Sequence, residues 1–224
     1  MTEPPPISLV CLDLAGIVID DSVVERAYAE AIATQGIVPG TQDYVRSMVR
    51  FDRSRGRPPA AVLRELFETD DLRAQVAVLA FDRSFRAAAK RFDVSVPAVV
   101  ADAIGKAAGS GAHVALVTVL SRSACKDLLG PLRTADLVLC ADDVPRSFPW
   151  PDPVLTAMLK LGTCDVREVA VVSATEDGVL SGHRAGAGLV AGLGGGGARS
   201  AEALRQAGAT HVLDSIAAFS DLLI

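Results

Sequence analysis

An apolar run near the N-terminus ends in one carboxylate and a turn. Residues 7–14 read Ile-Ser-Leu-Val-Cys-Leu-Asp-Leu, and Gly16 follows shortly after. A short apolar run closed by a glycine turn is typical of a buried strand in a parallel sheet, and ligands bind at the C-terminal edge of such sheets. Asp13 is therefore the first candidate functional residue, as a nucleophile, a metal ligand or the N-cap of the next helix.

The composition limits the partners. The chain has 224 residues, of which 50% are hydrophobic, and a net charge of -5. It is long enough for a core with a cap, and its charge argues against nucleic acid and anionic membrane surfaces. We expect a cytoplasmic protein without a membrane span, since we find neither a signal peptide nor an apolar stretch of about 18 residues. Its four cysteines lack Cys-x-x-Cys spacing and predict no zinc site.

A helical block follows the first strand. Residues 22 to 36 have an amphipathic helical pattern, and residues 41 to 94 contain helical segments at 43–49, 60–67 and 72–90 without strand-like alternation. From residue 96 onward, helical segments at 98–108 and 121–129 alternate with apolar strands at 114–118, 137–140 and from 169. We therefore predict a three-layer α/β core with a parallel sheet, formed by residues 1–21 and 96–224, and a helical cap at residues 22–95.

The turn after Asp13 carries a family motif. Asp13, Ala15, Gly16 and Asp20 stand in register with Asp-x-Ala-Gly-Thr-Thr-apolar-Asp, so the segment resembles the opening motif of the haloacid dehalogenase (HAD) superfamily, in its phosphonoacetaldehyde-hydrolase-like (phosphonatase-like) branch. The resemblance implies a HAD-like (Rossmannoid) core, a cap inserted after the first strand and Asp13 as nucleophile. It also places Ala15 and Gly16 at the substrate, with Ala15 where most HAD phosphatases have an acid-base aspartate.

Thr118 ends an apolar strand, as the second HAD motif does. The resemblance implies that its hydroxyl binds the substrate, although threonine also ends many strands through β-propensity alone. The cap stretch 45–55 is similar to the phosphonatase segment that leads to an imine-forming lysine. No lysine precedes Lys90 here, and arginine is not a Schiff-base nucleophile, so phosphonatase chemistry by that route is excluded. Arg50 and Arg53 could instead bind a carboxylate or phosphate, or form a solvated helix face.

The third and fourth motifs depart from the family pattern. Phe148 stands where a cationic residue is expected, and Ala174 and Gly178 stand where the family has two metal-binding aspartates; only Asp177 is placed to compensate. We therefore expect no metal or other cofactor, with Mg²⁺ doubtful. In a metal-independent enzyme, Thr118, Arg122 or Arg146 would orient the substrate, and Phe148 and Trp150 would suit an apolar ligand.

Charge argues against phosphatase activity. An aspartate and a phosphoryl dianion repel by about 4 kcal/mol per unit charge pair at an effective dielectric of about 20, unless cations offset them. Two hypotheses follow. The chain is a degenerate HAD member that binds a small molecule or a partner protein. Alternatively, it is a metal-independent enzyme, such as one of a biosynthetic pathway, that uses Asp13 on an uncharged or carboxylated substrate. The sequence leaves the oligomeric state open, a dimer included.

Overall fold

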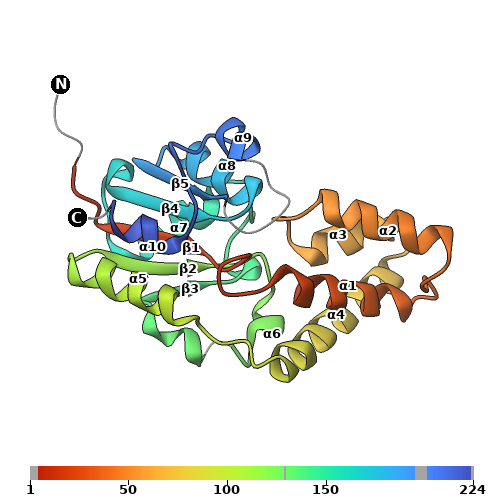
Figure 1. The fold of residues 1–224 in the computed structure, drawn as a ribbon. Coiled ribbons are helices and arrows are strands. Elements are labelled where there is room, and N and C mark those ends of the chain that lie inside the picture. Colours follow the sequence, from red (N-terminus) through yellow and green to blue (C-terminus); the bar gives the residue numbers. More distant parts are fainter. Residues whose placement is uncertain (1–4, 129, 195–200, 223–224) are drawn as a thin grey trace.

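The computed structural model describes residues 5–128, 130–194 and 201–222 (Figure 1). Its core is a parallel sheet of six strands in the order β3-β2-β1-β4-β5-β6. The strands are β1 (Leu9–Asp13), β2 (His113–Val117), β3 (Leu137–Leu139), β4 (Val169–Ser173), β5 (Leu189–Leu193) and β6 (His211–Leu213). Since β1 lies between β2 and β4, the strand that ends in Asp13 is central.

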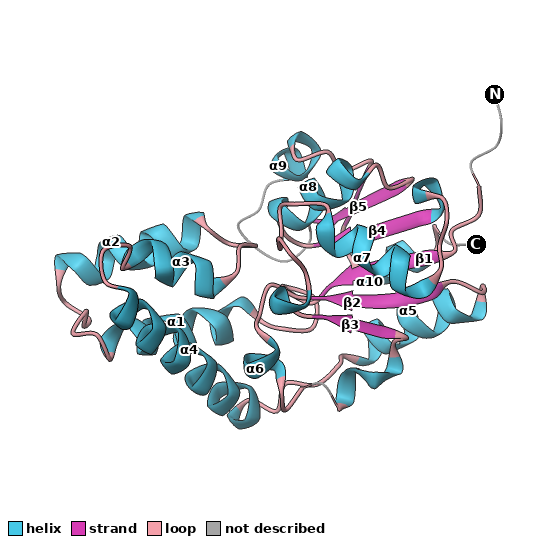
Figure 2. Ribbon diagram, turned by 180° about the vertical axis from the view of Figure 1, so that it is seen from behind, coloured by secondary structure: helices cyan, strands magenta, loops and turns pink. Residues whose placement is uncertain are grey.

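Helices cover both faces of the sheet (Figure 2). Alternation along β1 divides the core: Val10 and Leu12 belong to one apolar cluster, and Leu9 and Cys11 to another. The first cluster includes residues of α5 (Ala98–Gly109) and α10 (Ile216–Ser220), whereas α7 (Asp152–Leu161), α8 (Glu176–Ala185) and α9 (Ala201–Gln206) pack on the other side. The three-layer α/β architecture predicted from the sequence is therefore confirmed.

The cap consists of α1 (Asp21–Ala33), α2 (Gln42–Arg53), α3 (Pro59–Leu66) and α4 (Asp71–Arg91). These helices lie to one side of the sheet (Figure 1), and residues 41–94, all described, contain no strand. The predicted cap insertion is thus confirmed. The helix predicted at 121–129 is much shorter, since α6 spans only Arg122–Cys125. Among the described helices, none combines the length and apolar character needed to span a bilayer.

A buried carboxylate joins the cap to the core. Asp82 of α4 is 7% exposed, and its Oδ1 accepts a hydrogen bond from Ser121 Oγ at 2.9 Å. One turn further along α4, Arg86 Nε donates to Asp127 Oδ2 at 3.1 Å. The cap is therefore held against the loop after β2 by one buried and one exposed polar contact.

We expect Asp82→Asn to stabilise the protein increasingly as the pH rises. Burial is the main cause that raises the pKa of Asp82 above 3.8, reinforced by Asp142 and opposed by Ser121, Ser123 and Arg86. Above about pH 4, the folded protein keeps a proton that the unfolded chain has released, so its free energy of unfolding falls with rising pH. Asparagine does not titrate and avoids this loss. Urea unfolding of both proteins from about pH 4 to about pH 7 tests this; a pH-independent difference would contradict it.

Candidate active site

Asp13 is almost completely buried at the C-terminal edge of the sheet. Its side chain is 2% exposed, and Oδ1 accepts a hydrogen bond from the N–H of Ala15 at 3.0 Å. The N-cap of α1 is Asp20, whose side chain accepts from the N–H of Ser22. The helix-capping alternative for Asp13 is therefore wrong, and its carboxylate faces the end of the neighbouring strand β4.

Two hydroxyl groups bind the second oxygen of this carboxylate. Asp13 Oδ2 accepts hydrogen bonds from Ser173 Oγ at 2.7 Å and from Thr175 Oγ1 at 3.2 Å. The same hydroxyls accept from the backbone: Thr175 N–H donates to Ser173 Oγ, and Gly178 N–H donates to Thr175 Oγ1, both at 3.0 Å. The end of β4 and the first turn of α8 thus form a buried hydrogen-bond network around Asp13.

The fourth-motif positions carry no carboxylate beside this network. Ala174 is 7% exposed. Gly178 packs so closely that an added Cβ would lie 2.2 Å from Ser173 Oγ and 2.9 Å from Asp13 Oδ2. A larger side chain at position 178 is therefore incompatible with the present position of Ser173. Asp177 is half-buried, and its pKa is raised mainly by burial.

A small inner cavity of about 40 Å³ separates this network from the cap. Thr118, 2% exposed, contributes to its core side together with Ala15 and Thr175. Thr118 Oγ1 accepts a hydrogen bond from the N–H of Leu120 at 3.2 Å. On the cap side, Gly56 has φ = +89°, and a Cβ there would lie 2.9 Å from Asp177 Cβ. The cap loop therefore closes directly onto the end of the sheet.

A larger cleft of about 760 Å³ lies beside the inner cavity. It is lined by Gly16, Arg53 and Asp177, which are three of the residues singled out from the sequence, and by Ala174. Its volume falls in the range of about 300 to 1,000 Å³ that is usual for small-molecule sites. A ligand held between core and cap in these two spaces would therefore lie close to the residues that surround Asp13.

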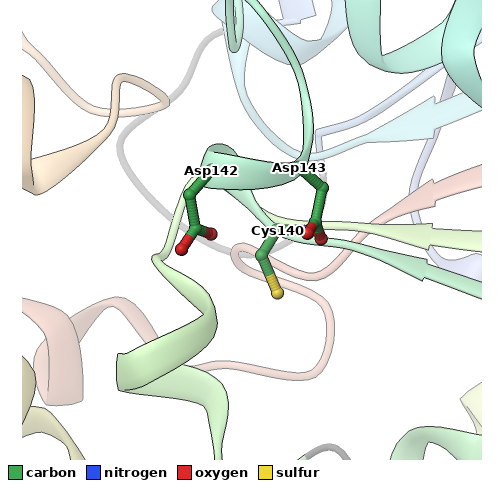
Figure 3. A group of neighbouring side chains, drawn as sticks. All are labelled: Cys140, Asp142 and Asp143. Carbon is green, nitrogen blue, oxygen red and sulfur yellow. The ribbon is translucent and has the colours of Figure 1, made fainter.

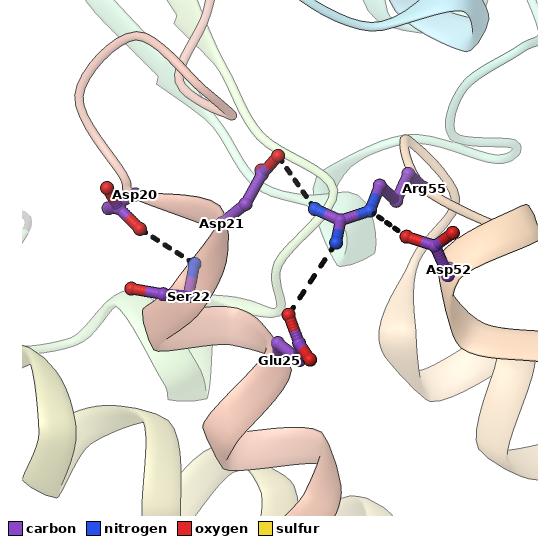
Figure 4. Close-up of polar contacts among 6 residues, drawn as sticks. All are labelled: Asp20, Asp21, Ser22, Glu25, Asp52 and Arg55. Atoms are coloured by element: carbon purple, nitrogen blue, oxygen red, sulfur yellow. Dashed lines mark hydrogen bonds and ion pairs between the residues drawn. The ribbon is translucent and has the colours of Figure 1, made fainter. Parts of the chain in front are cut away.

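The cap arginines nearest the inner cavity are already paired. Arg55 Nη1 contacts Asp21 Oδ2 at 2.8 Å, and Arg55 Nε contacts Asp52 Oδ1 at 2.6 Å (Figure 4). Glu25 lies 3.6 Å from the same guanidinium. Arg57, which also lines the cavity, forms an ion pair with Glu65. These positive charges are therefore largely neutralised before any ligand binds.

The two cap arginines singled out from sequence lie elsewhere on this surface. Arg50 is exposed and contacts Glu65 at 3.4 Å, whereas the exposed Arg53 lines only the larger cleft. Sequence reasoning gave no reason to rank Arg55 and Arg57 above them. Gly56, which lies between Arg55 and Arg57, could have indicated their importance. A glycine in a loop marks a sharp turn or a close approach of the backbone.

Phe148 does not contact a ligand space, which corrects the expectation from the third motif. It is 4% exposed and belongs to the apolar cluster between the sheet and α7, with Leu9, Val117 and Leu139. Among the described residues, it does not line either cavity beside Asp13. An apolar side chain here completes the core instead of forming a pocket wall.

Arg146 and Trp150 also lie outside both cavities and pair with each other. The Arg146 guanidinium lies 4.5 Å from the centroid of the Trp150 ring, and Arg184 lies 5.2 Å from it. Arg146 also donates two hydrogen bonds to Asp152, at 3.0 and 2.9 Å. Trp150 is 45% exposed. This group stabilises the entry to α7 and does not orient a ligand beside Asp13.

Arg122 is bound by a turn rich in metal-ligand residue types. Cys140, Asp142 and Asp143 place one potential ligand atom each within 4.8 Å of one another (Figure 3). However, Asp143 forms an ion pair with the Arg122 guanidinium and accepts from the N–H of Cys140, and Asp142 accepts from the N–H of Arg122 at 2.8 Å. The two carboxylates therefore stabilise this turn by binding Arg122. The Arg122 side chain is not directed at Asp13.

Ser173 and Thr175 contact Asp13 although sequence reasoning did not select them as site residues. Both were visible as polar residues at a strand end, where side chains of neighbouring strands meet. Their hydroxyls point at Asp13 because β4 pairs with β1 in parallel register, Leu12 opposite Val172. That register, and not residue type, brings the three side chains together.

Comparison with known proteins agrees with this architecture. No model of a protein family matches the chain. Phosphonoacetaldehyde hydrolases of Pseudomonas fluorescens (strain SBW25) and Pseudomonas aeruginosa (strain UCBPP-PA14) are each 42% identical to it over 57 residues. This match covers 25% of the chain but only 21% of those relatives.

Solved structures match nearly the whole chain at low identity. A phosphonoacetaldehyde-hydrolase-like protein from Oleispira antarctica has a TM-score of 0.81 at 20% identity, covering 98% of this chain and 92% of that one. A hydrolase from Pseudomonas syringae has a TM-score of 0.79 at 19% identity, covering 96% and 97%. A HAD family hydrolase from Deinococcus radiodurans R1 has a TM-score of 0.64 at 22% identity, covering 96% and 93%. The chain therefore has the fold of the HAD superfamily, in the form shared with phosphonoacetaldehyde-hydrolase-like proteins.

Proposed function

We propose that this chain is a HAD-fold protein that binds a small, uncharged molecule between core and cap and does not transfer phosphoryl groups with Mg²⁺. The observation that carries the proposal is the binding of Asp13 Oδ2 by the hydroxyls of Ser173 and Thr175. A carboxylate used in this way acts as an internal hydrogen-bond acceptor. Both of its oxygens accept hydrogen bonds from within the protein.

The residues around Asp13 do not fit a magnesium ion. Mg²⁺ requires near-ideal octahedral oxygen coordination at about 2.0 to 2.1 Å, usually with carboxylates and water. Ala174 contributes a methyl group, and Gly178 leaves no room for a side chain while Ser173 stays in place. Asp177 lies on α8 beside Gly56 of the cap loop. The residues around Asp13 therefore do not support metal-assisted chemistry.

The charges also favour an uncharged ligand. A phosphoryl dianion beside Asp13 is repelled by about 4 kcal/mol per unit charge pair at 4 Å and an effective dielectric of about 20. Arg55 and Arg57 could offset this repulsion only by giving up their ion pairs with Asp21 and Glu65. Since each of those pairs would have to break, Arg55 and Arg57 contribute little to anion binding, which leaves the exposed Arg53 as the cap arginine at the larger cleft.

We expect Asp13→Asn to destabilise the protein by about 1 to 3 kcal/mol, because one side of the amide must then present an N–H group to existing donors. The variant and the wild type should both lack Mg²⁺-stimulated hydrolysis of p-nitrophenyl phosphate. Urea unfolding, a phosphatase assay and calorimetric titration with Mg²⁺ measure these outcomes. Mg²⁺-dependent hydrolysis by the wild type that is lost in Asp13→Asn would contradict the proposal. Asp70→Asn serves as a control, since Asp70 caps α4 and lines neither of the two cavities beside Asp13.

A second candidate function is metal-independent catalysis with Asp13 as the nucleophile. The burial of Asp13 and the neighbouring Thr118 hydroxyl favour it, since a desolvated carboxylate can attack an uncharged carbon centre. Turnover of a 2-haloacid in the presence of a chelator, abolished by Asp13→Asn, would support this candidate over simple binding.

A further inference from the structure

Two buried cysteines outside the candidate active site lie against each other. Cys125 ends α6, and Cys140 begins the turn that follows β3. They are 0% and 1% exposed and belong to the same apolar cluster, and the two thiol groups share a hydrogen bond. Both cysteines are free, so this part of the molecule contains a pair of reduced thiols in contact.

Backbone hydrogen bonds hold the two segments that carry these thiols. The N–H of Ala141 donates to the carbonyl oxygen of Leu120 at 2.9 Å, and the N–H of Arg122 donates to Asp142 Oδ1 at 2.8 Å. α6 also packs on the turn Ala141–Asp143, which Figure 3 shows with the Cys140 side chain. A disulfide forms only between cysteines whose backbones already lie close together, and these contacts meet that condition.

The surroundings make the two thiols unequal. The pKa of Cys140 is lowered, mainly because the Cys125 thiol donates a hydrogen bond to its sulfur, although burial opposes this effect. The nearby Arg122 guanidinium also favours the thiolate of Cys140. The pKa of Cys125 is raised by the same hydrogen bond and by burial. Because the thiolate is the nucleophilic form of cysteine, Cys140 is the sulfur that reacts first.

An oxidant reaches the buried thiols through a small local opening. α6 is a single turn of four residues, Arg122–Cys125. Helices of this length are marginal by themselves, and such segments open locally at much lower cost than the sheet unfolds. Opening of α6 therefore uncovers both sulfurs while the core stays folded.

We propose that Cys140 and Cys125 form an oxidation site for hydroperoxides, with Cys140 as the attacking thiol and Cys125 as the resolving thiol. The Cys140 thiolate attacks one oxygen of hydrogen peroxide, the O–O bond breaks, and the hydroxide that leaves takes up the proton released by Cys140. The Cys125 sulfur then attacks the sulfenic acid at Cys140, the S–O bond breaks, and water leaves with the Cys125 proton. Two thiols and one peroxide thus give one disulfide and two molecules of water.

The disulfide would fix a loop that connects the inner cavity to the cap. Thr118 and Leu120, which precede α6, line that cavity, and Ser121 binds Asp82 of α4. A bond between Cys125 and Cys140 closes a loop of about 15 residues, which stabilises the folded state by restricting the unfolded chain. The oxidised protein should therefore melt about 6 to 12 °C above the reduced protein.

Peptide mapping tests the proposal. The full chain in a Cys164→Ser background, which removes the exposed thiol, is treated with excess hydrogen peroxide in the presence of a chelator, then denatured, alkylated and digested with trypsin. Lys126 and Arg133 separate the two cysteines in the sequence, so mass spectrometry should find their two peptides linked and reduction should release them. Cys11 is the internal control: it is 2% exposed, burial raises its pKa to about 12, and it should remain fully alkylated.

Single variants test the order of attack. Cys125→Ser should accumulate a sulfenic acid at Cys140 that dimedone traps, whereas Cys140→Ser should give at least about tenfold less trapping at Cys125. The cross-link is measured in protein that keeps both cysteines, so it does not depend on the stability of either variant.

The proposal is overturned if both thiols stay free after peroxide treatment, or if Cys11 becomes cross-linked as readily, since that would show oxidation of the unfolded chain. Equal trapping in the two single variants overturns the assignment of Cys140 as the attacking thiol. An oxidised protein that melts no higher than the reduced one overturns the stabilisation of the loop.

Discussion

Phe148→Ala is expected to reduce the free energy of unfolding by about 3 to 5 kcal/mol, the cost of removing a buried aromatic side chain. Phe148 is 4% exposed and belongs to an apolar cluster with residues of β1, β2, β3 and α7. In a domain of this size the change corresponds to a fall in Tm on the order of 10 °C. Urea denaturation followed by circular dichroism measures the loss directly.

Phe148→Leu is the matched control, because it keeps most of the apolar volume and should cost well under half as much. Phe148→Arg introduces the residue type that the family motif suggests, but here it would bury a charge without a partner and should be at least as damaging as alanine. If Phe148→Arg were as stable as the wild type, the side chain would have to leave the core for the ligand space, and the assignment of Phe148 to the core would fail.

The fold was predictable because its strands and helices follow simple patterns. The runs 9–13, 113–117 and 169–173 are apolar on both faces, as strands covered by helices on both sides must be. The cap was predictable because residues 41–94 lack alternation. By contrast, α7 was not predicted, although Gly162 at its C-cap, with φ = +77°, is a usual helix stop.

The site was predictable only where position along a strand fixes the side chain. Asp13 ends β1 and Thr118 directly follows β2; both are buried, and Thr118 lines the inner cavity together with residues of the cap. Phe148 follows a 3-10 turn and a loop after β3, so its direction depends on the backbone path. A motif alignment gives the residue type at such a position without giving its direction.

The sequence also did not reveal which charged side chains form ion pairs with each other. Arg122 and Asp143 are 21 residues apart, and Arg55 and Asp21 are 34 apart. An arginine count therefore overestimates the positive charge available to a ligand. Whether a guanidinium faces a substrate or a neighbouring carboxylate is decided by tertiary packing.

Ala174→Asp and Gly178→Asp are expected to create an Mg²⁺ site only when combined with Ser173→Gly. In the presence of Ser173, a Cβ at position 178 would lie 2.2 Å from its Oγ, so Gly178→Asp alone should cost about 1 to 3 kcal/mol of stability through overpacking. Ser173→Gly removes that obstacle and one of the two hydroxyl donors to Asp13. The effects should be strongly non-additive, because Ser173, Gly178 and Asp13 lie against one another and Ala174 follows Ser173 in the chain.

Calorimetric titration of the triple variant should give a dissociation constant on the order of 1 mM for Mg²⁺, equivalent to about 4 kcal/mol of binding free energy. The variant with only the two aspartates should bind none, since its added carboxylates raise the local negative charge without forming a complete oxygen shell. Ala15 should keep any phosphatase activity low, because general acid-base catalysis commonly contributes a factor of about 10² to 10⁴. If both variants bind Mg²⁺ equally, Ser173 is not the obstacle; if a folded triple variant binds none, position 178 does not face Asp13 in solution as it does here.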